Sequence, residues 1–170
     1  KAAIPLARRS LVIRVKALGP DHPDTASGLN ALAAILDEQG NYEEALRLYR
    51  IALAIREKNL GSDHPDVATS LNNLAGALRE QGKYGAAEPL SRRALAIREK
   101  SLGSDHPEVA TSLNNLAGVL SGQGQYGAAE LLHRRALSIR EKTFGLDHPE
   151  VASSLDNLAG VLRDQGKYGA

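Results

Sequence analysis

Four histidines are the residues of this chain with the clearest capacity for chemistry. His22, His64, His106 and His148 each stand in the tetrad Asp-His-Pro-(Asp/Glu), which recurs every 42 residues. Imidazole and carboxylate groups are common metal ligands. If the repeats stack as helical hairpins, however, equivalent histidines lie roughly two interhelix distances of about 8–10 Å apart, whereas ligands lie about 2 Å from one ion. We therefore expect no metal site and no cofactor, and we assign the tetrad to a helix start.

No other arrangement of polar residues in the sequence indicates catalysis. There is no phosphate-binding loop, no paired-carboxylate pattern and no Ser-His-Asp arrangement. The chain has no cysteine, which removes disulfides, thiolate ligands and cysteine nucleophiles together. The carboxylates recur with the repeat, as a structural role requires. The sequence therefore predicts a protein that is not an enzyme.

The period of 42 residues organises the whole chain. Residues 64–105 and 106–147 are identical at 31 of 42 aligned positions, without a gap. Within each unit, two stretches place apolar residues three and four positions apart, which is the pattern of an amphipathic helix. The short connection Gln81-Gly82-Lys83 forces the two helices to lie antiparallel and adjacent. Each repeat is thus predicted to be a helical hairpin that begins at Asp63, Pro65 and Asp66 or their equivalents.

Stacked hairpins predict an all-α fold in the form of a solenoid. The expected helices cover residues 3–18, 22–39, 42–59, 64–81, 84–101, 106–123, 126–143 and 148–165, and a ninth would begin at 168–170. The whole chain, 1–170, is then a single array. Residues 1–20 form the second helix of a truncated repeat, 21–62, 63–104 and 105–146 form full repeats, and 147–170 form a partial repeat.

The unit resembles the tetratricopeptide repeat family. The resemblance rests on Leu74-Ala75, the Gln-Gly-x-Tyr turn at 81–84, Ala87 and Ala94-Leu95. The string Ala-Ile-Arg-Glu-Lys-x-Leu-Gly-x-Asp-His-Pro is similar to the longer, 42-residue variety found in the kinesin light chain. This resemblance implies a right-handed superhelical solenoid that binds extended peptides or partner helices along a concave groove lined by the first helices. It implies scaffolding and no catalysis. At the large aromatic position of the second helix the chain carries Tyr49, Ser91 or His133, and we expect His133 to be partly buried.

The candidate binding residues lie opposite the buried face of the first helices. If Leu71 marks the middle of that face, an advance of 100° per residue puts Thr69, Asn72, Asn73 and Gly76 on the other side. Asparagine offers a donor and an acceptor to a peptide backbone, although these residues could instead pair neighbouring first helices. A helical glycine costs about 1 kcal/mol, so either a ligand backbone or an adjacent helix is expected to approach it closely. The candidate groove set is Asn30, Thr69, Asn72, Asn73, Gly76, Thr111, Asn114, Asn115, Gly118 and Asn157.

Charge and hydropathy point to protein partners. Lys and Arg number 21 against 20 Asp and Glu, so no basic field favours nucleic acid or a membrane surface. No apolar run approaches the roughly 20 residues of a membrane span, and the lack of cysteine favours a cytoplasmic location. Arg92-Arg93 and Arg134-Arg135 form basic rows, continued by Arg98 and Arg140. These rows could attract an acidic peptide, or they could be a solvated outer face with Glu88–Arg92 and Glu130–Arg134 pairs.

Three functions remain open at this stage. The first is a scaffold that binds a protein or peptide ligand in the groove. The second is self-assembly, in which uncapped ends of the solenoid stack on one another or swap helices. The third is a regulatory segment of a larger multidomain protein.

Overall fold

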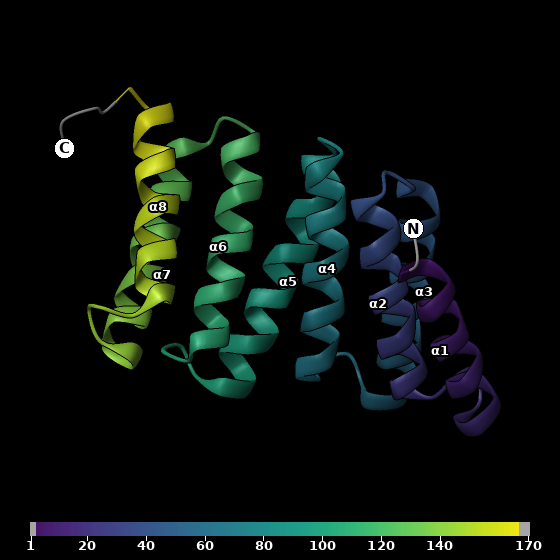
Figure 1. Ribbon diagram of the computed structural model, residues 1–170. Coiled ribbons are helices and arrows are strands. Elements are labelled where there is room, and N and C mark those ends of the chain that lie inside the picture. The colour runs from purple at the N-terminus through teal and green to yellow at the C-terminus, as the bar shows by residue number, and fades with distance from the viewer. Residues whose placement is uncertain (1–2, 167–170) are drawn as a thin grey trace.

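The computed structural model describes residues 3–166 and folds them into eight helices with no strand in that range. Consecutive helices pack as antiparallel pairs, and the array is extended rather than round (Figure 1). The all-α fold class is confirmed, and every predicted helix boundary within the described residues is correct to one residue. The expected ninth helix lies outside these residues. The helices are α1 (Ala3–Leu18), α2 (Pro23–Glu38), α3 (Tyr42–Leu60), α4 (Pro65–Glu80), α5 (Tyr84–Leu102), α6 (Pro107–Gly122), α7 (Tyr126–Phe144) and α8 (Pro149–Asp164).

The Asp-His-Pro tetrad stands at the start of each first helix, and its histidine, not its aspartate, is the N-cap. His64 is the N-cap of α4, and its Nδ1 accepts a hydrogen bond from the backbone N–H of Asp66 at 3.1 Å. Pro65 follows, at a position where a missing N–H costs nothing. Asp63, which we expected to mark the helix start, instead forms an ion pair with Lys100 at 2.5 Å. Histidine therefore satisfies the free N–H at the helix start, and the same cap recurs at α2, α6 and α8.

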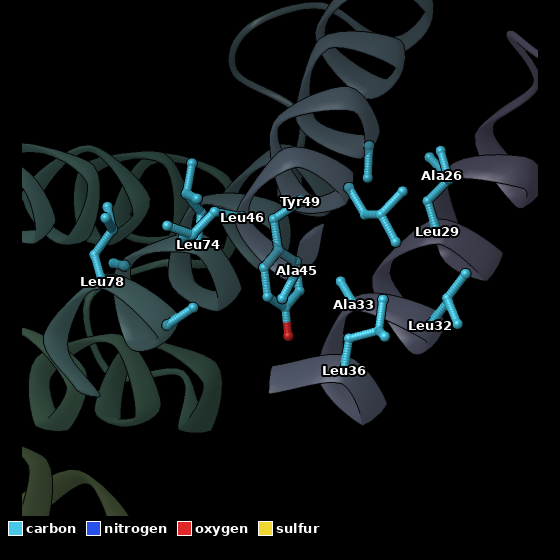
Figure 2. Packing of buried hydrophobic residues seen from close by; sticks show 14 of the residues in the cluster. Ala26, Leu29, Leu32, Ala33, Leu36, Ala45, Leu46, Tyr49, Leu74 and Leu78 are labelled. Carbon is cyan, nitrogen blue, oxygen red and sulfur yellow. The ribbon is translucent and has the colours of Figure 1, made fainter. Parts of the chain in front are cut away.

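The core is made of small and branched aliphatic side chains. Figure 2 shows the alanines and leucines of α2 and α3 packed together, with the ring of Tyr49 between them and the leucines of α4. Leu71 and Leu113, the central residues of α4 and α6, are fully buried. Each buried leucine contributes on the order of 1.5–3 kcal/mol, so stability is spread along the array.

The first helices lie on the inner side of the array. The backbones of α2 and α4, of α4 and α6, and of α6 and α8 approach one another, whereas no two second helices in the described chain approach this closely. The row of α2, α4, α6 and α8 can be followed across Figure 1. Closer spacing on the first-helix side curves the array toward that side. None of the described helices is long and apolar enough to cross a membrane.

Candidate functional site

Two neighbouring asparagine positions on the first helices have different surroundings. The first position holds Asn30 and Asn72, which are only 8% and 6% exposed. Asn30 donates from Nδ2 to Ser70 Oγ at 3.3 Å, and Asn72 donates from Nδ2 to Ser112 Oγ at 3.0 Å. Both bonds run from one first helix to the next. Asn30 and Asn72 therefore pair neighbouring first helices, which is one of the two roles that the sequence left open for the asparagines.

The next position along each helix faces away from the core. We call its members the outward row: Ala31, Asn73, Asn115 and Asn157, which stand 42 residues apart. Asn73 and Asn157 are exposed and Asn115 is half-buried. None of the three side-chain amides forms a hydrogen bond with another described residue. Their amides are therefore available to an external group.

A buried arginine anchors each asparagine-serine pair from the second helix. Arg98 is 5% exposed, and its Nη1 donates to Ser112 Oγ at 3.0 Å and to the backbone carbonyl of Glu108 at 3.1 Å. Its Nη2 donates to Thr69 Oγ1 at 3.3 Å and lies 2.8 Å from Glu108 Oε2. Burial lowers the pKa of Arg98, and the charge of Glu108 opposes that effect. Thr69, a candidate binding residue, is thus engaged from inside the protein.

The same network recurs in the flanking repeats. Arg56 donates to Ser70 Oγ at 2.8 Å, and Arg140 donates to Ser154 Oγ at 2.9 Å. The expectation that Arg98 and Arg140 continue a basic outer row is therefore wrong, because both guanidinium groups turn inward to buried acceptors. In the sequence, the only sign of these arginine-serine bonds is that the arginines and the serines both recur every 42 residues.

In the third repeat the equivalent asparagine, Asn114, contacts a histidine instead of a serine of the next first helix. His133 is 5% exposed, as expected of a residue in the aromatic position, and its Nδ1 lies 2.8 Å from Asn114 Oδ1. Burial lowers the pKa of His133, which favours the neutral imidazole. The hydroxyl of the half-buried Thr111 donates to the carbonyl of Pro107 at 3.5 Å. Asn114 and Thr111 are thus both engaged within the chain.

The mid-helix glycines divide into two kinds. A methyl group on Gly118 would lie 2.7 Å from Arg79 Nη1, so here an arginine side chain of α4 covers the glycine. At Gly76 and Gly160 nothing lies within 4 Å of the position of a methyl group. At Gly118 the nearest atoms belong to the Arg79 side chain and not to a helix backbone, and the surface over Gly76 and Gly160 is open.

The outer surface of the second helices is a lattice of ion pairs. Arg92 and Arg134 pair with Glu88 and Glu130 at 2.8 and 2.9 Å, as the solvated-face alternative predicts. Arg93 reaches Glu57, and Arg135 reaches Glu99, both at 2.6 Å. Among residues 3–166 no group of three or more His, Cys, Asp or Glu is arranged to hold a metal ion. The charges of this surface are largely neutralised within it.

Comparisons with known proteins agree with the geometry. One tetratricopeptide repeat model matches residues 1–58, 29–100 and 66–142, and another matches residues 151–170. No curated protein matches the chain.

Solved structures with the same fold include kinesin light chain-like proteins. BtubC (BKLC) from P. vanneervenii is 28% identical with a TM-score of 0.81, over 96% of this chain and 65% of that one. A kinesin light chain-like protein of Podosopora anserina, with nearly identical TPR-like repeats, is 30% identical with a TM-score of 0.80, over 96% of this chain and 77% of that one. Apo RapI, 18% identical with a TM-score of 0.75 over 97% of this chain and 44% of its own, shares the fold alone. Together with the family matches, these findings show that the chain belongs to the tetratricopeptide repeat family, whose repeats generally form protein-interaction modules.

Proposed function

We propose that the chain binds an extended segment of a partner protein on the face formed by its first helices. One observation carries this proposal: Asn73, Asn115 and Asn157 repeat at equivalent positions, yet none of their side-chain amides has a hydrogen-bond partner among the described residues. Folding does not explain their identity. An amide that is free to donate and accept matches the alternating N–H and C=O groups of an extended backbone.

The buried network holds this face in place. Asn72 and Arg98 meet at Ser112 and fix α4 relative to α6. The amides of Asn73 and Asn115 are therefore presented at a set spacing before a ligand arrives. Such preorganisation lowers the entropic cost of binding.

One edge of the face is acidic and indicates the charge of the ligand. Glu38 and Glu80 are exposed near the ends of α2 and α4. Burial, together with Glu80 and Glu38, raises the pKa of Asp37. Burial and the same three carboxyl groups raise the pKa of Tyr49 to about 12. A ligand segment that lies at this edge is expected to be basic, and a terminal carboxylate there would be repelled.

Selection from a random peptide pool tests the proposal. The purified chain should retain peptides, and retained sequences should be enriched in Lys or Arg. Replacing Asn73, Asn115 and Asn157 with Ala should weaken binding on the order of a hundredfold, since three hydrogen bonds at about 1 kcal/mol each are lost.

A second triple variant is the matched control. Arg50, Arg92 and Arg134 stand at one equivalent, exposed position of the second helices. Replacing them with Ala should leave peptide retention unchanged. Loss of binding in this variant alone would move the site to the second-helix surface and overturn the proposal.

A further inference from the structure

We propose that the C-terminal ends of α2 and α4 form a single site for one lysine or arginine side chain of the bound segment, built by Asp37, Glu80 and the hydroxyl of Tyr49. We call these three residues the cation site. The inference rests on the proposed function and deepens it, because the site lies at the acidic edge of the first-helix face. It names one residue of the ligand and the place where that residue binds.

The two helix ends lie next to each other and are both negative. Because consecutive helices are antiparallel, α2 and α4 run in the same direction, and their backbones approach one another. The carbonyl groups at the end of a helix carry a partial negative charge. Asp37 and Glu38 add carboxyl groups at the end of α2, and Glu80 adds one at the end of α4. Burial, and then the charges of Glu80 and Glu38, raise the pKa of Asp37, so the carboxyl groups act on one another.

Two buried polar groups of the cation site have no hydrogen-bond partner within the described chain. Tyr49 is 4% exposed, and its hydroxyl forms no hydrogen bond with another residue of 3–166. Figure 2 shows this hydroxyl pointing toward the end of α2 that carries Leu36, the neighbour of Asp37. Asp37 Oδ1 is buried and has no hydrogen bond either. Since buried polar atoms are as a rule hydrogen-bonded, these two oxygens indicate a donor supplied from outside the chain.

The hydroxyl of Tyr49 lies in the field of the same carboxyl groups. Tyr49 packs in one cluster with Leu36 and Leu78, which stand one and two residues before Asp37 and Glu80. Burial, and then the charges of Asp37, Glu80 and Glu38, raise the pKa of Tyr49 to about 12. The phenol is therefore neutral near pH 7, and its oxygen can accept a hydrogen bond from a cationic N–H.

No cation of the described chain compensates the charge of Asp37. Neither Asp37 nor Glu38 forms an ion pair among residues 3–166. Arg79 Nη2 lies 3.8 Å from Glu80 Oε1, but Nη1 of the same side chain reaches toward Gly118 of α6. Because Arg79 extends toward α6, a basic side chain of the ligand is the counterion that fits between α2 and α4.

The cation site occurs once, although the repeats are nearly identical. The later repeats differ at all three of its positions: Arg79, Ser121 and Arg163 follow Asp37, Gly122 and Asp164 follow Glu80, and Ser91 and His133 follow Tyr49. The outward row of asparagines repeats and can bind a peptide backbone in more than one register. A single cation site selects one register, because only one placement puts the basic residue of the ligand beside Asp37.

A single amino-acid derivative tests the site without a peptide. The probe is Nα-acetyl-arginine amide, and its control is Nα-acetyl-citrulline amide, which has nearly the same shape without the charge. In nuclear magnetic resonance of the labelled chain, the arginine probe should shift the ring signals of Tyr49 and the carboxyl signal of Asp37, whereas the citrulline compound should not. Equal shifts with both compounds, or no shift with either at millimolar concentration, would overturn the proposal.

Asp37→Arg fills the site from within the chain. Arginine stands at the equivalent position of two other repeats, as Arg79 and Arg163, so the variant should fold like the unmodified chain, which circular dichroism can check. The new guanidinium lies beside Glu80, and the shift of the Tyr49 signals by the arginine probe should disappear. A shift that persists in full would show that the probe binds elsewhere.

Two further variants separate the hydroxyl from the charge. Tyr49→Phe removes only the hydroxyl and should weaken binding of the probe about three- to tenfold, since one hydrogen bond is lost. Asp164→Asn is the matched control, because Asp164 is equivalent to Glu80 but has neither Asp37 nor Tyr49 beside it. Its affinity for the probe should be unchanged. Equal losses in Asp164→Asn and Tyr49→Phe would mean that general negative charge, and not the cation site, attracts the probe.

Peptide selection separates a failure of the cation site from a failure of the proposed function. Peptides retained by the unmodified chain should share a Lys or Arg at one position, and Asp37→Arg should bind them about ten- to hundredfold more weakly, as expected for a hydrogen bond to a charged group. Peptides that share no basic residue and bind both chains equally would contradict the cation site and leave the first-helix face as the binding surface. If no peptide is retained but the arginine probe shifts Tyr49, the proposed function is wrong and the cation site remains supported.

Discussion

Arg98 of α5 and Ser112 of α6 are joined by a hydrogen bond of 3.0 Å from the guanidinium to the hydroxyl, inside the protein. The same hydroxyl accepts from Asn72 of α4. Three helices from two consecutive hairpins therefore meet at one serine. This relationship explains how a core made mainly of alanine and leucine holds a defined superhelical register, because apolar contacts alone are not directional.

Removal of the arginine should show the cost of losing this junction. Arg98→Ala removes one of the two donors to Ser112 Oγ and the side-chain donor to the carbonyl of Glu108, and it creates a cavity, so the free energy of unfolding should fall by about 2–4 kcal/mol. Arg92→Ala, on the exposed side of the same helix, should cost no more than about 1 kcal/mol. Urea unfolding of both variants, followed by circular dichroism, measures the difference. Equal losses would show that Arg98 contributes no more than a surface ion pair.

Asn72 and Asn73 provide a direct test of the two asparagine positions. Asn72→Ala removes the buried bond to Ser112 and should lower the free energy of unfolding by about 1–2 kcal/mol. Asn73→Ala changes an exposed residue, so stability should change by no more than about 0.5 kcal/mol while peptide affinity falls. Stability and peptide retention measured on both variants separate the effects. The reverse pattern would mean that the inner and outer positions have been confused.

The open space over Gly76 predicts opposite effects on folding and on binding. Gly76→Ala should stabilise the chain by about 0.5–1 kcal/mol, because a methyl group meets no atom within 4 Å and alanine is the better helix former. At Gly118 the same change should stabilise less, since Arg79 must first move away. If a ligand backbone passes over Gly76, the stabilised Gly76→Ala variant should bind peptides more weakly. Unchanged affinity would place the ligand elsewhere on the face.

His133 makes stability depend on pH. Burial lowers the pKa of His133 below its ordinary value of 6.5, which the unfolded chain regains. Between the folded pKa and 6.5 the unfolded state therefore binds more protons, so the free energy of unfolding rises with pH in this window and falls on acidification below 6.5. In His133→Tyr this contribution disappears, and Tyr49 shows that a tyrosine fits the equivalent position.

The measurement is the slope of unfolding free energy against pH, from about 5 to 7, where histidine titrates. The slope should be shallower in His133→Tyr than in the unmodified chain. Identical slopes would show that the imidazole is not desolvated in the folded state.

The fold was predictable because its signal is redundant. Four copies of one pattern, with apolar residues at helical spacing and a short Gln-Gly connection, define the helices to one residue. The helix caps were less predictable, since Asp63 and His64 both suit a helix start. Only the structure shows that His64 accepts the hydrogen bond from the backbone N–H of Asp66.

The site was only partly predictable, because it depends on contacts between repeats. Helical geometry places Asn72 and Asn73 about 100° apart on the same broad polar side. Which of the two turns toward the next helix depends on the angle between hairpins, and no local pattern encodes that angle. Arg98 was misplaced for a related reason. Arginine is rarely fully buried, and its burial here depends on acceptors supplied by the following repeat.

Chemical-shift mapping with a peptide selected on the chain tests the central claim most directly. Addition of the peptide to the labelled protein should shift the side-chain amide signals of Asn73, Asn115 and Asn157, with little change at Asn72, which is buried. The second-helix positions Arg50, Arg92 and Arg134 should be unaffected. If the shifts instead cluster at those arginines, and the three asparagine amides do not move, the first-helix face is not the binding surface.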